Sequence, residues 1–441
     1  MPKTKEDVLS AIDAAGVKYI RLWFTDILGR LKGMSITRSE IQEVLEMGQG
    51  FDGSSIEGFV RIEESDLMAI PDLDSFRVIP WDIAGERVAS VFCDVQNPDG
   101  TPHEGDPRWV LRRMLKKARD LGYTYYCGPE TEFFYLRDNK TPQPLDYGGY
   151  FDYGTIDEGT KVRKKTVNAL EQLGVTVECS HHEVAPSQHE IDLKYQDALV
   201  MADFTMLYRL VVKEIAADNG VYATFMPKPM FGVNGSGMHT HMSLFKGDTN
   251  AFFDPGDPYQ LSAVAKYFVA GLLTHVREIT LVLNQWVNSY KRLVVGYEAP
   301  VYISLGRRNR SSLIRIPMYR VGKEKATRIE LRSPDPACNP DLAFSLMLAA
   351  GLRGIEKKYE LPAPIEENIF EMDLQSRDRN NIQALPDSLE NAIEVFAQSK
   401  LARETLGDHI FETLIANKKV EWDRYRMAVT SYEWESYLPQ L

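Results

Sequence analysis

Hydrophobic and polar residues alternate along much of the first hundred positions, which is the pattern of half-buried β-strands. Residues 17–24 and 31–36 alternate in this way and are separated by a turn ending in glycine, so they predict a hairpin. Residues 39–47 instead place apolar side chains at helical spacing, and residues 87–95 predict another strand. The first part of the chain is therefore expected to be rich in strands.

The turn-forming residues 97–102 (NPDGTP) form the strongest such cluster in the first half of the chain. We place a domain boundary there, which divides the chain into residues 1–102 and 103–441. A helical period follows, with Asp106 as the N-cap and Pro107 as the first helical residue. Further helices are predicted at residues 161–173, 197–217, 261–283, 342–357 and from 389 onward. This mixture of helices and strands predicts an α+β fold.

The composition fits a large globular chain, since 44% of its 441 residues are hydrophobic and 26% are charged. A net charge of −12 argues against nucleic-acid binding. No apolar run is long enough for a membrane span, and the N-terminus shows no signal peptide. The four cysteines are scattered, which predicts a cytoplasmic protein without a zinc or disulfide framework.

Candidate chemistry begins in residues 128–135, where aromatic residues follow two glutamates and favour a strand. Glu130 and Glu132 would lie on the same face of that strand, roughly 6–7 Å apart. Two such carboxylates repel each other unless cations lie nearby. For an isolated pair of this kind a solvated edge strand is the favoured explanation, so the prediction depends on other segments.

Three other segments carry matching side chains. Glu183 and Glu190 flank Pro186 in a predicted strand–turn–strand, although an exposed loop is the simpler explanation for that segment alone. His239 shares a face of a predicted strand with His241 and Ser243, after a glycine-rich loop. A histidine in a strand can also be purely structural.

Residues 328–332 alternate strictly, so Arg328, Glu330 and Arg332 share a face, as they would in a cross-strand ladder of ion pairs. Five carboxylates and one imidazole offer mostly hard donor atoms, which select Mg²⁺ or Mn²⁺ rather than zinc. The candidate metal ligands are Glu130, Glu132, Glu183, Glu190, His239 and Glu330.

A basic group accompanies these acids. Guanidinium groups suit phosphate and carboxylate oxygens, and their combination with divalent cations predicts phosphoryl transfer from a nucleotide. The chain has neither a P-loop nor a dinucleotide-binding fingerprint. The arginines are Arg292, Arg310, Arg315, Arg328 and Arg332.

Together these segments resemble type I glutamine synthetase of bacteria or archaea, in collinear order over nearly the whole chain. The motifs that carry the resemblance are residues 51–56 (FDGSSI), 128–134 (GPETEFF), 181–185 (HHEVA), 228–229 (KP), 234–239 (NGSGMH), 288–292 (NSYKR), 296–300 (GYEAP) and 328–335 (RIELRSPD).

The resemblance implies an N-terminal β-grasp-like domain and a larger catalytic domain with a curved antiparallel sheet and flanking helices. It implies ATP-dependent ligation of ammonia to L-glutamate through γ-glutamyl phosphate, with two or more Mg²⁺ or Mn²⁺ ions per subunit. It also implies a homododecamer of two hexameric rings, each active site lying between subunits, and a nitrogen-responsive transcription regulator as a partner.

The resemblance assigns roles by position. One metal ion would be held by Glu132, Glu183 and Glu190, and the other by Glu130, His239 and Glu330. Asp52 of a neighbouring subunit would take the proton from ammonium, and residues 296–298 resemble a lid. Glutamate would meet Asn234, Gly235, Arg292, Glu298, Arg310 and Arg332. ATP would meet Glu178, His241, Ser243, Arg310, Arg315 and Arg328.

Departures from the family pattern are also visible. Val295 stands where proline usually precedes the lid glycine, and residues 323–325 look like a small insertion before Arg328. Phe370 replaces the tyrosine of adenylylated forms, so that modification is excluded. The length resembles the alpha type, in which the position of Arg61 mediates feedback inhibition; a surface salt bridge explains Arg61 equally well.

Three other functions remain open from the sequence. A γ-glutamyl-amine ligase would share the metal and ATP sites but lack the anionic ammonium pocket that Asp52 and Glu298 predict. A catalytically silent scaffold on the same fold would have lost metal ligands. A simple cation-binding protein would not need the arginines.

Overall fold

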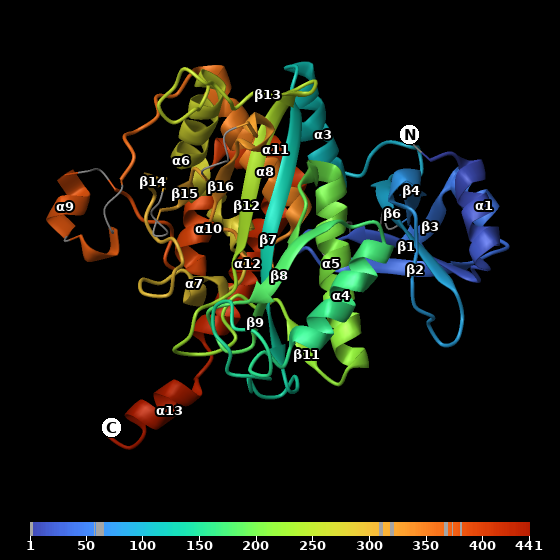
Figure 1. The fold of residues 1–441 in the computed structure, drawn as a ribbon, viewed down its shortest axis with the longest axis horizontal. Coiled ribbons are helices and arrows are strands. Elements are labelled where there is room, and N and C mark those ends of the chain that lie inside the picture. Colours follow the sequence, from blue (N-terminus) through green and yellow to red (C-terminus); the bar gives the residue numbers. More distant parts are fainter. Residues whose placement is uncertain are drawn as a thin grey trace.

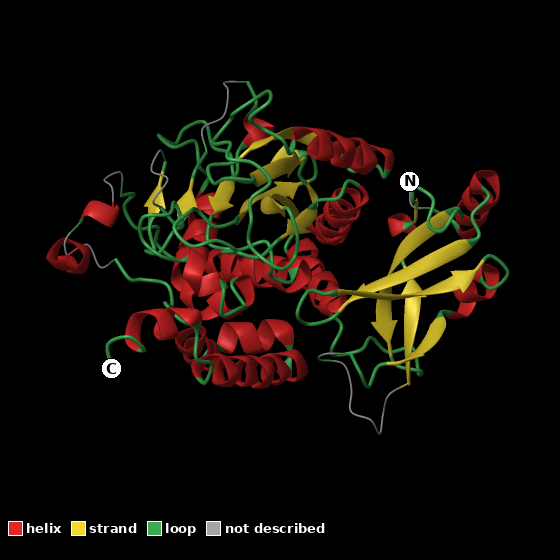
Figure 2. Ribbon diagram, turned by 90° about the horizontal axis from the view of Figure 1, so that it is seen from below, coloured by secondary structure: helices red, strands yellow, loops and turns green. Residues whose placement is uncertain are grey.

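The computed structural model describes residues 3–56, 58, 66–307, 312–317, 322–365, 369–372, 374–379 and 382–441. Its N-terminal part lies to one side of a larger helical and sheet-containing part (Figures 1 and 2). The polypeptide passes between them through a turn at residues 97–101, in which the Asn97 amide donates to the Thr101 carbonyl at 2.8 Å. The division at residue 102 remains a prediction.

The N-terminal part is built on a mixed sheet with the strand order β2-β1-β6-β4-β3, and β5 also pairs with β6. The predicted hairpin is present as antiparallel β1 and β2, and β1 pairs in parallel with β6. The strands are β1 (Tyr19–Thr25), β2 (Leu31–Thr37), β3 (Gln49–Asp52), β4 (Asp66–Pro71), β5 (Arg77–Val78) and β6 (Val88–Gln96).

Two short helices, α1 (Lys5–Ala15) and α2 (Ile41–Met47), contribute buried side chains to the core of this sheet. Val8 and Ile12 of α1 enter that core, although the sequence pattern did not predict this helix because its other positions are mostly polar. The side chains of Trp23 and Phe92 instead join the core of the larger part. Apolar contacts therefore connect the two parts. A 3₁₀ turn, η2 (Leu73–Ser75), precedes β5.

A second, mostly antiparallel sheet forms the centre of the larger part, with the order β14-β15-β16-β12-β7-β9-β8. Its long strands are β7 (Thr124–Leu136) and β12 (Met238–Lys246), with β8 (Val177–His182), β9 (Gln188–Leu193) and β16 (Ile329–Leu331) beside them. Short strands complete the sheet: β10 (Gln196–Asp197), β11 (Tyr222–Thr224), β13 (Thr249–Asn250), β14 (Leu305–Gly306) and β15 (Ile314–Arg315).

Most helices of the larger part gather on one side of this sheet (Figure 2). The predicted cap of α3 is present, with Asp106 accepting from the Arg108 amide and Pro107 in the first turn. The helices are α3 (Pro107–Asp120), α4 (Thr160–Gln172), α5 (Ala198–Asp218), α6 (Ala263–Leu283), α7 (Ser289–Arg292), α8 (Pro340–Lys357), α9 (Leu374–Arg379), α10 (Leu389–Ala397), α11 (Lys400–Leu406), α12 (Asp408–Arg426) and α13 (Ser431–Tyr437), with 3₁₀ turns η3 (Glu324–Ala326) and η4 (Ile369–Glu371).

Helices α6 and α8 approach each other closely because glycines lie where they meet. A Cβ atom on Gly354 would lie 2.0 Å from the Tyr267 carbonyl oxygen, and one on Gly271 would lie 2.2 Å from that of Ala350. Both helices contribute to one large apolar core together with residues of the sheet. Within the described ranges, no helix has the length and apolar character that crossing a membrane requires.

Candidate active site

Strand register brings the predicted acids together at the centre of the large sheet. Glu132 of β7 lies opposite Glu190 of β9, and Glu130 lies opposite His239 of β12. On the next strand, Glu330 lies opposite His241. Side chains two residues apart share a face of a strand, so these groups from four neighbouring strands point into one space. We call that space the acidic pocket; it has a volume of about 250 Å³ and is lined by all six predicted metal ligands.

The first cluster in the acidic pocket is formed by Glu130, His239 and Glu330, whose ligand atoms all lie within 4.8 Å of one another. His239 Nδ1 is 3.5 Å from Glu130 Oε2 and 3.9 Å from Glu330 Oε1. These are the three residues that the family resemblance assigns to one metal ion. Their separation allows a single cation to bind between them after small side-chain movements.

The second cluster contains Glu183 and Glu190, as expected, together with His181, whose role the sequence did not reveal. His181 Nε2 lies 2.8 Å from Glu183 Oε1 and 3.9 Å from Glu190 Oε1. Glu132 borders this cluster through its cross-strand pairing with Glu190. The strand–turn–strand prediction is confirmed: β8 and β9 form the hairpin, and Ser187 adopts a left-handed conformation (φ 58°) in the turn.

A buried polar network holds this turn in place. Asp146 accepts hydrogen bonds from the Ser187 amide at 3.1 Å and contacts His182 Nε2 at 2.8 Å. Behind it, Arg163 contacts His189 Nδ1 and pairs with both oxygens of Asp157. Because the side chains of the two histidines and Asp157 are fully buried, rearranging the turn would leave polar groups without partners. The buried network therefore fixes the backbone position from which Glu183 enters the acidic pocket.

The carboxylates of the acidic pocket are too crowded to be charged together without cations. Burial and the charge of Glu183 raise the pKa of Glu132 to about 8. Burial and neighbouring Asp192 and Glu132 hold the pKa of Glu190 well above its usual range. Burial also opposes ionisation of Glu130, but His241 and His239 outweigh it and hold that pKa well below its usual range.

Hard divalent cations fit this donor set. Glu132, Glu190 and Glu330 expose at most 7% of their surface, so water cannot substitute for counterions there. Carboxylate oxygens with one imidazole are donors that Mg²⁺ and Mn²⁺ accept. Two divalent ions would nearly neutralise the five carboxylates.

Three arginines border the same pocket. Arg315 Nε lies 2.5 Å from Glu330 Oε2, and Arg332 Nε lies 3.3 Å from Glu330 Oε1. Arg292 is fixed from behind, since its guanidinium donates to three backbone carbonyls of residues 332–334. Gly237 leaves room for it, because a Cβ atom there would lie 2.5 Å from Arg292 Nη2. Guanidinium groups of these three arginines therefore lie beside the carboxylates of the acidic pocket.

An adjoining cavity of about 190 Å³, here called the side pocket, is lined by most of the residues expected to meet ATP: Glu178, His241, Ser243 and Arg328. Arg328 Nε donates to His241 Nδ1 at 3.2 Å, and His241 Nε2 contacts Glu130 Oε1 at 2.6 Å. Lys325, from the segment that looks like an insertion, also lines this pocket. The two pockets share Glu130 and Asp192 as a common wall.

The residues expected to meet glutamate, Asn234, Gly235, Arg292, Glu298 and Arg332, line the acidic pocket. Asn234 Nδ2 donates to Glu298 Oε2 at 3.4 Å. Gly296 (φ 98°) and Glu298 (φ 56°) both adopt left-handed conformations in the segment predicted as a lid. Asp52 does not line either pocket, and it lies at the end of an exposed strand in the N-terminal part. Arg310 and Arg61 lie outside the described residues.

Sequence reasoning overlooked several lining residues. Gln188 donates to Glu132 Oε2 at 2.7 Å and to the Gly235 carbonyl at 3.1 Å. Gln188 and Asp192 are each two residues from Glu190 in β9, so period-2 alternation would have placed all three side chains in the pocket. Tyr150 and Phe151 contact the His181 ring, with centroid distances of 5.7 and 4.7 Å. Nothing in their local sequence indicates that contact.

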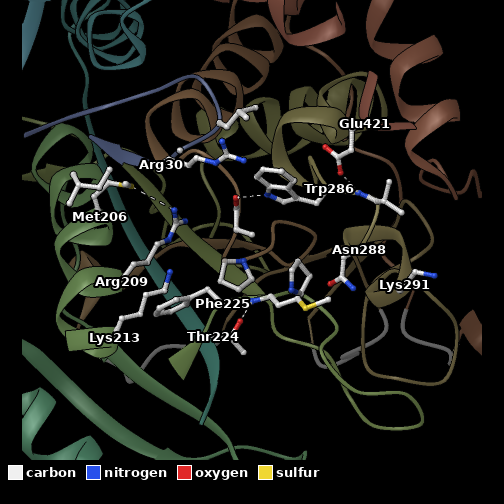
Figure 3. A pocket seen from close by; sticks show the side chains of 18 of the residues that line it. Arg30, Met206, Arg209, Lys213, Thr224, Phe225, Trp286, Asn288, Lys291 and Glu421 are labelled. Carbon is white, nitrogen blue, oxygen red and sulfur yellow. Dashed lines mark hydrogen bonds between the residues drawn. The ribbon is translucent and has the colours of Figure 1, made fainter. Parts of the chain in front are cut away.

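A larger cavity of about 760 Å³ lies elsewhere, between the hairpin turn at Arg30, helix α5 and the segment around Trp286 (Figure 3). Its lining includes Met206 and Phe225, and its only acidic lining residue among those described is Glu421. The Glu421 carboxylate accepts from the Val287 amide at 3.0 Å. Size alone would select this cavity, but charged groups converge in the acidic pocket, and we place the active site there.

Comparison with known proteins shows the family to which the chain is similar. A family model described as glutamine synthetase, beta-Grasp domain, matches residues 16–98, and one described as glutamine synthetase, catalytic domain, matches residues 104–437. Glutamine synthetase of Mycolicibacterium smegmatis is 52% identical over 99% of this chain and 100% of its own length. That of Thermotoga maritima is 52% identical over 99% of both chains.

A solved complex of GmaS with ADP superposes with a TM-score of 0.89 at 30% identity, covering 98% of this chain and 99% of the other. The likeness therefore extends over both parts of the structure. The chain belongs to the glutamine synthetase family.

Proposed function

We propose that the acidic pocket joins ammonia to the side-chain carboxylate of L-glutamate at the expense of ATP. The chain is a glutamate–ammonia ligase that forms glutamine, ADP and phosphate. The observation that carries this proposal is the convergence of five glutamates and His239 from the sheet and its turn beside three arginines and a second pocket. Full-length identity of about half to curated glutamine synthetases supports it.

Family membership implies divalent cations, and we propose two Mg²⁺ or Mn²⁺ ions. Glu132, Glu183 and Glu190 would hold one, and Glu130, His239 and Glu330 the other. When bound, such ions offset the charge of phosphate oxygens and orient the group being transferred. The inclusion of His181 in the second cluster is compatible with this assignment, since its Nε2 lies 2.8 Å from Glu183 Oε1 and would orient that carboxylate.

Phosphoryl transfer then requires two substrates to be aligned. We propose that ATP enters through the side pocket, where Glu178, His241, Ser243 and Arg328 bind it and direct its γ-phosphate toward Glu130 on the common wall. Glutamate lies in the acidic pocket with its α-substituents near Asn234, Gly235 and Arg292. Its γ-carboxylate attacks the γ-phosphate and forms γ-glutamyl phosphate, while Arg315, Arg332 and Arg310 stabilise the charge on the transferring group.

Ammonium is attracted to an anionic position at Glu298 and, across a subunit boundary, to Asp52 of a neighbour. Loss of a proton to Asp52 makes ammonia a nucleophile, which displaces phosphate from the acyl phosphate. Water would hydrolyse that intermediate, so residues 296–298 close over it as a lid. Lys228 Nζ lies 3.7 Å from the centroid of the Tyr297 ring, and this contact would hold the lid segment.

Because Asp52 does not line the acidic pocket of its own chain, this mechanism needs an oligomer. A homododecamer of two hexameric rings remains the predicted assembly, and the cytoplasm the predicted location. A nitrogen-responsive transcription regulator remains a predicted partner. Feedback inhibition of the enzyme through Arg61 remains a predicted form of regulation. Phe370 contacts Tyr302 at a centroid distance of 6.2 Å and has no hydroxyl that could be adenylylated.

The test of this function measures phosphate release from ATP with glutamate and either ammonium or a panel of small primary amines. Each assay is run with Mg²⁺, with Mn²⁺ and with a chelator. Release that requires glutamate, ammonium and a divalent ion is expected. Turnover with amines alone would identify an amine ligase, and release with no acceptor at all would favour a silent scaffold.

A further inference from the structure

A further group of side chains that can bind metal lies at the edge of the acidic pocket, and two of its members, Cys179 and Asp192, have no role in the proposed reaction. Strand pairing places Cys179 of β8 opposite Asp192 of β9, next to the pair formed by His181 and Glu190. One ligand atom from each of Cys179, His181 and Asp192 lies within 4.8 Å of the others. Cys179 is the one exposed cysteine, whereas the other three are buried.

The donor chemistry of this group differs from that of the two glutamate clusters. A thiol, an imidazole and one carboxylate form a softer set, which favours zinc over Mg²⁺ or Mn²⁺. A tetrahedral zinc ion separates its ligand atoms by about 3.3–3.8 Å, given bonds of about 2.0–2.3 Å. The ligand atoms of the three residues lie within 4.8 Å of one another, so side-chain rotation would have to bring them to these separations, and all three residues line the acidic pocket.

Some polar atoms of this group have no hydrogen-bond partner among the described residues. Cys179 Sγ donates to Asp192 Oδ2 at 2.6 Å, and a metal ion would replace that shared proton. His181 Nδ1 and Asp192 Oδ1 are buried and have no hydrogen-bond partner in the part of the chain that the structure describes. Buried polar atoms without partners are uncommon and call for an explanation.

We propose that Cys179, His181 and Asp192 form a third cation site, selective for Zn²⁺, through which zinc inhibits the enzyme. His181 would connect this site to the glutamates, because its Nε2 contacts Glu183. Asp192 lines both the acidic pocket and the side pocket, so the ion would lie at their common wall. The positive charge of a bound zinc ion there would repel the divalent cations that bind in the acidic pocket. It would also hold the His181 ring in place, so that His181 could no longer adjust to Glu183.

The binding test uses Co²⁺ as a spectroscopic substitute for zinc, added to the full-length enzyme in excess Mg²⁺. We expect one Co²⁺ per chain with a thiolate-to-metal charge-transfer band, which Zn²⁺ bleaches by displacement. Cys179→Ser keeps the size of the side chain but removes the sulfur, so the band should disappear. The three buried cysteines remain in this variant and act as an internal control.

A second measurement follows zinc inhibition of each protein relative to its own zinc-free rate. The zinc concentration for half inhibition should rise about tenfold or more in Cys179→Ser. A thiolate band that persists in the variant, or none in the unmodified enzyme, would overturn the proposal. Equal inhibition of the two proteins would overturn the inhibitory role. The spectroscopic result is independent of the reaction catalysed, so it separates this proposal from the proposed function.

Discussion

At the scale of single residues, the acidic pocket depends on groups that hold the carboxylates as much as on the carboxylates themselves. Glu132 receives hydrogen bonds from the Gln188 side chain and from the Gly237 amide, at 2.7 and 2.9 Å. These two donors fix the carboxylate while its pKa is raised by burial. Residues that orient metal ligands commonly affect metal affinity nearly as strongly as the ligands do.

Replacement of Gln188 by alanine should therefore weaken binding of the metal ion next to Glu132. We expect the Mn²⁺ dissociation constant to rise roughly tenfold, because Glu132 loses one of its two orienting donors. Titration of the variant with Mn²⁺, followed by isothermal calorimetry, measures this. Gln196→Ala, at an exposed position outside both pockets, is the matched control. Unchanged affinity in Gln188→Ala would show that the hydrogen bond does not support the site.

At the scale of elements, α3 joins the two parts of the structure through a buried charge network. Arg108 contacts Asp72, Asp94 and Asp203, and Arg112 contacts the first two of these. The cap residue, Asp106, accepts from the backbone amides of Val95 and Arg108. Burial and the charge of Asp94 raise the pKa of Asp106 to about 7.

The raised pKa of Asp106 makes the stability of the folded protein depend on pH. Asp106 ionises near pH 4 in the unfolded chain but keeps its proton in the folded protein until about pH 7. The folded state therefore binds more protons over that interval, and its stability falls as pH rises from about 4 to 7. Above about pH 7 this contribution is constant.

Asp106→Asn should lower the melting temperature at every pH, because the Val95 amide loses its acceptor. The deficit relative to the unmodified protein should shrink as pH rises from about 5 to 7, since asparagine has no proton to lose. Differential scanning fluorimetry at about pH 5, 6 and 7 measures it. Asp99→Asn, in an exposed turn, is the control. A deficit that stays constant with pH would contradict the raised pKa.

The sequence predicted elements well where a pattern was strong and local. The cap at Asp106, the hairpin of β1 and β2 and the turn between Glu183 and Glu190 all followed from residue types at fixed spacing. Helix α1 was missed because only Val8 and Ile12 are buried in it. His181 was missed as part of a cluster because its role depends on the register between β8 and β9, which no single segment reveals.

At the scale of the whole molecule, the proposed mechanism uses Asp52, which does not line the acidic pocket of its own chain. The acidic pocket lies in the large sheet, whereas Asp52 lies in the N-terminal part to one side of it (Figure 1). The expectation that Asp52 acts in a neighbouring subunit comes from the resemblance and stays a prediction, since spacing alone cannot distinguish contacts within a chain from contacts between chains. Under the proposed mechanism, each pocket would receive Asp52 from a neighbouring subunit.

Mixing two inactive variants tests whether Asp52 acts in the pocket of a neighbouring subunit. Asp52→Ala and Glu190→Gln should each abolish glutamine formation, because one removes the proton acceptor and the other a metal ligand. Coexpressed in equal amounts, they should regain about a quarter of the activity, since random assembly leaves that share of interfaces with both residues intact. Activity that stays absent in the mixed oligomer, while each variant still assembles, would place Asp52 and Glu190 in the same subunit's site.

The most direct test of the whole account is to locate divalent ions in crystals soaked with Mn²⁺, using the anomalous scattering of manganese. Two peaks are predicted in each acidic pocket, one bounded by Glu132, Glu183 and Glu190 and the other by Glu130, His239 and Glu330. Crystals of Glu190→Gln should lose or weaken the first peak and keep the second. Absence of both peaks from the pocket, or manganese bound only elsewhere, would contradict the account.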